Sequence, residues 1–132
     1  MFTSIDHPAI ACYDVQRQIN WYCQNLGMRV IARGETAALV GYGEDVRGGA
    51  MIELMAKKHE GPPPIEVPTH CAGLRHLALR VANFEEAKKK LLAAGANFIG
   101  EPGKAVGGGR IQSFRDPEGN ELQIVERSTT DN

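Results

Sequence analysis

The feature of this sequence that most constrains its fold is a short pattern that occurs twice. It runs from His7 to Asp14 in the first half and from His76 to Asn83 in the second. Each copy opens with a histidine, alternates apolar with small or polar residues, and closes seven positions later on an Asx residue that can cap a helix. Because alternate residues of a strand face opposite sides, we expect each histidine to face away from the helix.

The repeat continues through both halves. In each half a helix follows the cap, ends at Gly27 or Gly95, and is succeeded by three strands. Counting from the stopping glycine aligns Glu53 with Gln123 in the last strand of each half. The expected elements are strands at 5–13, 28–33, 36–42 and 50–56 with a helix at 15–25, and strands at 74–82, 96–99, 110–114 and 120–126 with a helix at 84–94.

This order predicts the fold class and the domain organisation. A chain of 132 residues is enough for one domain. We expect a single α+β domain of two tandem βαβββ modules, at about 1–57 and 74–127, with the helices on the outer faces of the sheets. A linker that contains Pro62-Pro63-Pro64 joins the modules.

Charge and hydropathy exclude several classes of function. Fifteen basic and sixteen acidic residues leave a net charge of -1, which gives no footprint for nucleic acid or an anionic membrane. No apolar run approaches the roughly 20 residues that span a bilayer, and we expect no signal peptide. Three cysteines without C-x-x-C spacing favour a reducing compartment. We therefore expect a cytoplasmic protein that binds neither nucleic acid nor membrane.

The repeat places four polar side chains at equivalent positions, and these are the candidates for chemistry. Imidazole nitrogen, carboxylate oxygen and amide oxygen suit a divalent metal of borderline hardness, with water completing the coordination. Structural roles remain alternatives for each residue: a strand histidine, an outward carboxylate, or an amide beside a metal. A glycine-rich loop is expected at 100–109. Its segment 103–109 lacks the spacing of a phosphate loop, and we interpret that segment as a mobile loop that covers the site. The four residues are His7, Glu53, His76 and Gln123.

Paired βαβββ modules of this kind resemble the vicinal oxygen chelate superfamily, which includes glyoxalase I, methylmalonyl-CoA epimerase, extradiol dioxygenases, and the fosfomycin- and bleomycin-resistance proteins. The resemblance covers about residues 5–126. Its most specific parts are the segment from His7 to Gly27, with Trp21-Tyr22 inside it, and the segment from Phe114 to Asn120. It implies a metal-binding cavity enclosed by curved mixed sheets, and a homodimer.

The resemblance also implies the ligands. One divalent metal (Ni, Co, Zn, Mn or Fe) per site would be held by His7, Glu53, His76 and Gln123. Gln123 is a departure, because glyoxalase I and many relatives have a glutamate there. Glu53 is then the one carboxylate ligand able to act as a base.

The leading hypothesis is a metal-dependent glyoxalase-I-like lyase or isomerase that acts through an enediolate on a small carbonyl or thiol-adduct substrate. Glu53 would be the general base. Arg80, on the face of His76, and Glu121 are candidates for substrate binding, although Arg80 also suits a surface role.

One alternative is an extradiol-type dioxygenase, since two histidines and one carboxylate are the donor set of non-haem iron oxygenases. The other is a non-catalytic protein that binds a drug or metabolite. A site within one chain and a site across a dimer both remain open.

Overall fold

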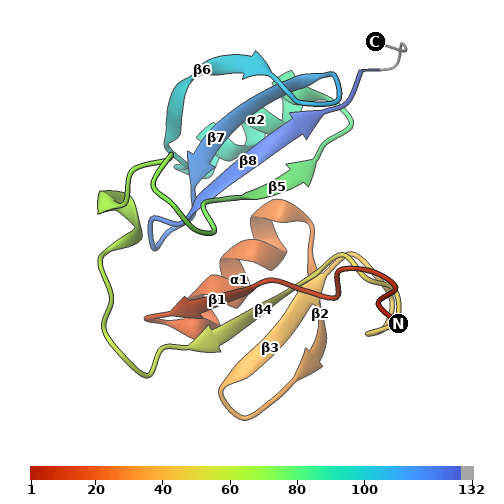
Figure 1. The fold of residues 1–132 in the computed structure, drawn as a ribbon, viewed down its shortest axis with the longest axis vertical. Coiled ribbons are helices and arrows are strands. Elements are labelled where there is room, and N and C mark those ends of the chain that lie inside the picture. The colour runs from red at the N-terminus through yellow and green to blue at the C-terminus, as the bar shows by residue number, and fades with distance from the viewer. Residues whose placement is uncertain (129–132) are drawn as a thin grey trace. The chain divides into compact units, whose positions relative to one another are not determined.

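The computed structural model describes residues 1–128 and divides the chain into two compact units, Met1–Glu60 and the part from Gly61 onward. Within residues 1–128 each unit holds one mixed four-stranded sheet and one α-helix (Figure 1). This confirms the predicted α+β class with two βαβββ modules. No described helix is long and apolar enough to cross a bilayer. Within residues 1–128, Cys12, Cys23 and Cys71 form no disulfide.

The first unit forms a sheet with the strand order β1-β4-β3-β2. β1 runs parallel to β4, whereas β3 pairs with both β4 and β2 in antiparallel fashion. Helix α1 lies across one face of this sheet (Figure 1). The elements are β1 (Ala9–Cys12), α1 (Val15–Leu26), β2 (Arg29–Arg33), β3 (Ala37–Gly41) and β4 (Met51–Ala56).

Local chemistry fixes both ends of α1. The carboxylate of Asp14 accepts a hydrogen bond of 3.0 Å from the backbone N–H of Arg17, which caps the first turn. Gly27 ends the helix with φ of 71°, a left-handed conformation that glycine adopts without steric cost. Between these ends Ile19 and Tyr22 are buried, and they pack the helix onto the sheet. The helix therefore covers one face of the sheet, and Glu53, which lies between the buried Ile52 and Leu54 of β4, faces the other side.

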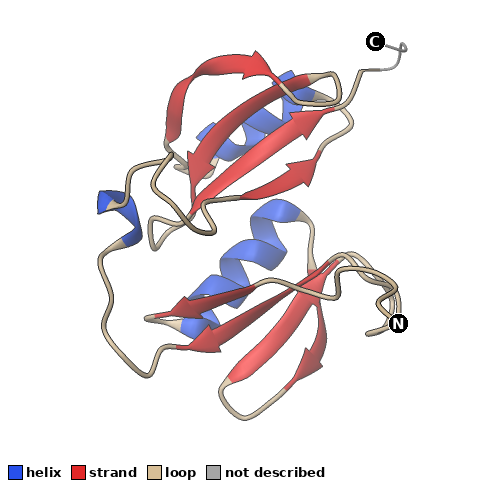
Figure 2. Ribbon diagram, viewed as in Figure 1, coloured by secondary structure: helices blue, strands red, loops and turns tan. Residues whose placement is uncertain are grey.

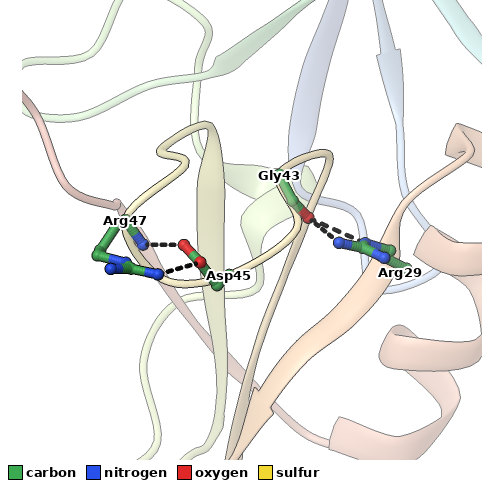
Figure 3. Close-up of polar contacts among 4 residues, drawn as sticks. All are labelled: Arg29, Gly43, Asp45 and Arg47. Carbon is green, nitrogen blue, oxygen red and sulfur yellow. Dashed lines mark hydrogen bonds and ion pairs between the residues drawn. The ribbon is translucent and has the colours of Figure 1, made fainter.

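The connection between β3 and β4 is held by two arginines (Figure 3). The Arg29 guanidinium reaches from β2 and donates to the Gly43 carbonyl through Nε at 2.9 Å and Nη2 at 2.7 Å. Asp45 accepts from the backbone N–H of Arg47 at 2.9 Å and from its Nη2 at 2.8 Å. These hydrogen bonds from Arg47 lower the pKa of the Asp45 carboxyl. The connection thus has a defined conformation at both its start and its middle.

The second unit repeats this arrangement with the strand order β5-β8-β7-β6 (Figure 2). β5 runs parallel to β8, and β7 pairs antiparallel with β8 and β6. A short 3₁₀ helix, η1, precedes the sheet. The elements are η1 (Pro64–Glu66), β5 (Leu77–Arg80), α2 (Phe84–Ala93), β6 (Phe98–Lys104), β7 (Arg110–Arg115) and β8 (Glu121–Glu126).

Helix α2 is tied to β8 at its first turn. Asn83 caps it by accepting from the backbone N–H of Glu86 at 2.9 Å, as the sequence predicts. The backbone N–H of Phe84 donates to the carboxylate of Glu126, at the end of β8, at 2.8 Å. Leu122 and Ile124 of β8 are buried, at 0% and 2% exposure, on the side that α2 covers. Gln123 therefore faces the other side of the sheet.

The main difference from the expected elements lies in β6. The strand extends to Lys104, so the first half of the glycine-rich segment expected as a loop, 100–104 of 100–109, belongs to the sheet. Its register with β7 shifts between Ile99 and Gly103, and Gly100 has a positive φ of 62°. Glycine weakens a regular strand but permits such an irregularity, which is why the composition alone suggested a loop. Arg127 stabilises the connection between β6 and β7, because its Nη1 donates to the carbonyls of Val106 and Gly108.

Candidate functional site

The strand register gives the candidate residues of the two units equivalent positions. Ala9 of β1 pairs with Glu53, and Ala78 of β5 pairs with Gln123. His7 and His76 each lie two residues before that alanine, just ahead of β1 and β5. An extended backbone there would put each histidine on the sheet face of the polar residue of the last strand. In the first unit the pairing extends one residue before the start of β1, because the N–H of Glu53 donates to the Pro8 carbonyl at 2.9 Å. The alignment deduced from the repeat is confirmed by these pairs.

The first half-site is the pair of His7 and Glu53. His7 Nε2 lies 3.7 Å from Glu53 Oε1, and the two side chains are 33% and 34% exposed. His7 Nδ1 lies 2.7 Å from the Asp6 carboxylate, which accepts its hydrogen. A histidine that donates from Nδ1 keeps the Nε2 lone pair free for a ligand or metal.

The spacing of this pair fits a shared metal ion better than a hydrogen bond. A separation of 3.7 Å is too long for a good N–H···O hydrogen bond. Two ligands that each lie roughly 2.1 Å from a metal can be up to roughly 4.2 Å apart. His7 and Glu53 therefore have the chemistry and the spacing of neighbouring metal ligands.

The second half-site contains a buried amide oxygen. Gln123 Nε2 donates to Ser113 Oγ at 3.0 Å. Gln123 Oε1 is buried and accepts no hydrogen bond from any residue in the described part of the chain. Leaving a buried carbonyl oxygen unsatisfied costs roughly 1–3 kcal/mol, so such an atom calls for a partner. A divalent cation is a suitable partner, and His76, which is exposed, occupies the position equivalent to His7.

The two residues expected to bind substrate differ in their surroundings. Arg80, at the end of β5, is exposed. Glu121 is only 8% exposed, and its Oε2 accepts a hydrogen bond of 2.8 Å from Ser113 Oγ. Glu121 thus contacts Ser113, which pairs with Gln123 across the strands, and it exposes little surface to a substrate.

Ser113 is the site residue that the sequence reasoning missed. It lies on β7 directly opposite Gln123 and joins Gln123 to Glu121 by hydrogen bonds. A signal for it exists in the sequence, since Ser113 stands three residues before Asp116 and Gln123 stands three residues after Asn120. If Asp116 and Asn120 are the two ends of a turn between antiparallel strands, the equal spacing places Ser113 opposite Gln123.

Each unit supplies one imidazole nitrogen and one oxygen donor. Among residues 1–128 the structure brings together no group of three or more histidine, cysteine, aspartate or glutamate side chains that could hold a metal. Two donors are fewer than the three or four that protein metal sites commonly use. Each half-site by itself is therefore an incomplete metal centre.

The family model described as Glyoxalase/Bleomycin resistance protein/Dioxygenase superfamily matches residues 4–124. A protein named lactoylglutathione lyase from Escherichia coli O157:H7 is 32% identical over 127 residues, covering 91% of this chain and 90% of that protein. Uncharacterized protein YwkD of Bacillus subtilis (strain 168) is 30% identical over 129 residues, covering 96% and 99%.

Among solved structures, the crystal structure of SMU.1112c matches with a TM-score of 0.75 and 23% sequence identity. The match covers 96% of this chain and 100% of that one. It shows that the fold is shared along the whole of that chain.

Proposed function

Since this chain belongs to the Glyoxalase/Bleomycin resistance protein/Dioxygenase superfamily, we propose that it is a metal-dependent glyoxalase-I-like enzyme, a lyase or isomerase. The proposed substrate is a small carbonyl compound or thiol adduct with two vicinal oxygens. The similarity to proteins named lactoylglutathione lyase supports this choice within the superfamily. The observation that carries the proposal is the pair of His7 and Glu53, at 3.7 Å, with Nε2 of the histidine free for a ligand.

The proposed metal ligands are two residues from each module. Their donor atoms, two imidazole nitrogens and two side-chain oxygens, suit Ni, Co, Zn, Mn or Fe. When bound, the ion supplies Lewis-acid stabilisation of the negative charge that develops on the substrate oxygens. The four ligands are His7, Glu53, His76 and Gln123.

Glu53 is the proposed general base. It would take the proton from the carbon beside the carbonyl and return it to the neighbouring carbon. It suits this role because it is the single carboxylate in the proposed ligand set, and because its side chain is still one-third exposed. Asp6 accepts the hydrogen of His7 Nδ1, and this contact would keep the lone pair of Nε2 available to the metal. Arg80 is the proposed contact for a negatively charged part of the substrate.

The experiment that tests the function starts from protein purified without chelator. Elemental analysis identifies the metal, and formation of lactoylglutathione from methylglyoxal and glutathione is then measured with that metal, with EDTA, and after re-addition of the metal. We expect a stoichiometric divalent metal and a turnover that EDTA abolishes and metal restores.

Other outcomes of the same experiment point to the alternatives. Bound iron, no lactoylglutathione, and oxygen uptake with a catechol would support the extradiol-type dioxygenase. Protein that neither contains nor takes up any of the five metals, and that turns over no substrate, would contradict the proposal. That result would favour the alternative hypothesis that the protein binds a small molecule without catalysis.

A further inference from the structure

A chain of two hydrogen bonds runs along the sheet of the second unit to the proposed ligand Gln123. Ser113 Oγ lies 2.8 Å from Glu121 Oε2 and 3.0 Å from Gln123 Nε2. A carboxylate only accepts, so the single hydroxyl hydrogen of Ser113 is donated to Glu121. The Ser113 oxygen is then left to accept, and the amide NH₂ of Gln123 is the group that can donate to it.

The direction of these two hydrogen bonds decides which end of the Gln123 amide faces away from Ser113. The nitrogen of Gln123 is turned toward the hydroxyl, and the oxygen is the buried atom that accepts no hydrogen bond within residues 1–128. If the amide were reversed, two acceptor oxygens would face each other and an NH₂ group would take the place of Oε1. An NH₂ group cannot ligate a cation, because its nitrogen lone pair is delocalised and its hydrogens carry positive charge.

The first unit provides an internal comparison. There the residue opposite Glu53 on the neighbouring strand is Leu39, and the residue two positions before Glu53 is the buried Met51. The corresponding positions of the second unit hold Ser113 and Glu121. A carboxylate has two equivalent oxygens and needs no choice of orientation, whereas an amide does. The polar pair thus occurs in the unit whose last strand carries an amide.

We propose that Ser113 and Glu121 are positioning residues that orient the Gln123 side chain so that its oxygen, and not its nitrogen, faces the divalent cation. The inference rests on the proposed function, because it takes Gln123 as a ligand. It adds two residues to the site and a reason why an amide can serve where relatives use a carboxylate.

The test is the affinity of the purified apo protein for Co²⁺, measured by competition with a chromophoric chelator. Replacing a residue that orients a metal ligand typically lowers affinity by roughly 10–100-fold, and we expect a loss in this range for Ser113→Ala. Ser113→Thr keeps the hydroxyl and should restore the affinity. Glu121→Gln should also weaken binding, since a carboxamide can donate to Ser113 and no longer fixes the direction of the hydrogen bonds.

The decisive control is the same Ser113→Ala change in a Gln123→Glu background. A carboxylate at position 123 presents an oxygen in either orientation, so the loss of Ser113 should then leave Co²⁺ affinity nearly unchanged. An equal loss of affinity in both backgrounds would show that Ser113 acts only through the packing of the sheet, and would overturn the inference. Thermal unfolding of each apo variant checks that the sheet is intact.

Gln123→Ala separates the failure of this inference from that of the proposed function. If Gln123→Ala weakens Co²⁺ binding and Ser113→Ala does not, the orienting role is wrong and the ligand set stands. If Gln123→Ala binds Co²⁺ as the wild type does, Gln123 is no ligand and the inference falls with that part of the set. A wild-type protein that binds no Co²⁺ overturns both.

Discussion

Glu53 is the residue on which the proposed chemistry depends most directly. Glu53→Gln keeps an oxygen donor near His7 Nε2 but removes the group that carries the proton. General acid–base catalysis is typically worth about 10²–10⁴-fold, so we expect kcat to fall by that factor while part of the metal is retained. Steady-state kinetics and metal content measured on the same preparation check this.

The matched control for this variant is Glu44→Gln. Glu44 is an exposed glutamate of the β3–β4 connection, in the same unit as Glu53 and outside the proposed site. The substitution removes the same charge and should leave kcat unchanged. An unchanged kcat in Glu53→Gln, with metal bound, would show that another group moves the proton.

Asp6 gives a second prediction at the scale of single residues. Its carboxylate accepts from His7 Nδ1 at 2.7 Å, and Asp6→Ala removes the contact that fixes the tautomer. Co²⁺ affinity should fall by roughly tenfold, at the lower end of the range for such contacts because the Asp6 side chain is 72% exposed. An affinity equal to that of the wild type would mean that water replaces Asp6 at Nδ1.

Sequence reasoning located the paired candidates but missed the residue that joins two of them. His7 and His76, and likewise Glu53 and Gln123, follow from a repeat, which is a relation along the chain. Ser113 follows from a cross-strand pair, and that pairing depends on the conformation of the turn between β7 and β8. Glu121 was expected to contact substrate, and its burial was not foreseen.

At the scale of elements, three side chains link the ends of β1 and β4. Lys57 Nζ donates to Glu60 at 2.7 Å, and the Tyr13 hydroxyl donates to the same carboxylate at 3.1 Å. The hydrogen bonds from Lys57 and then from Tyr13 lower the pKa of Glu60. Because the folded-state pKa is the lower one, the contact stabilises the fold above the unfolded-state pKa of about 4.3 and is lost as the pH falls through the folded-state pKa.

Glu60→Gln tests this linkage. At neutral pH the variant should have a smaller free energy of unfolding than the wild type, by a small amount because the group is fully exposed. The difference should vanish in acid, at a pH below the lowered folded-state pKa, where both states of the wild type bind the proton. Urea titrations at the two pH values measure it, with the exposed Glu35→Gln as the control. A difference of equal size at both pH values would contradict the electrostatic explanation.

The helices and most strands could be predicted because their signals are local. Asp14 and Gly27 mark the ends of α1, and Asn83 marks the start of α2, within a residue or two of where the structure has them. β6 could not be predicted to its end. A glycine-rich sequence has little strand preference of its own, and the pairing with β7 that extends β6 is not local.

At the scale of the whole molecule, the open sheets predict assembly. The order of strands leaves β1 and β2 at the edges of one sheet and β5 and β6 at the edges of the other. An unpaired edge strand can pair with a further chain, and two-fold homodimers are by far the commonest oligomers. We predict a homodimer. Sedimentation velocity at micromolar concentration should give twice the mass of one chain, and a monomer under those conditions would refute the prediction.

The amide at position 123 has a consequence for charge balance. Of the four proposed ligands, the two histidines and Gln123 are neutral, and Glu53 carries the single negative charge. A dication in this set would retain one positive charge, where a second glutamate would cancel it. Such a centre attracts anions and becomes more favourable as a substrate loses its proton and turns anionic. We therefore expect small oxyanions such as carbonate and oxalate to compete with the substrate, and to do so less well when Gln123→Glu restores neutrality.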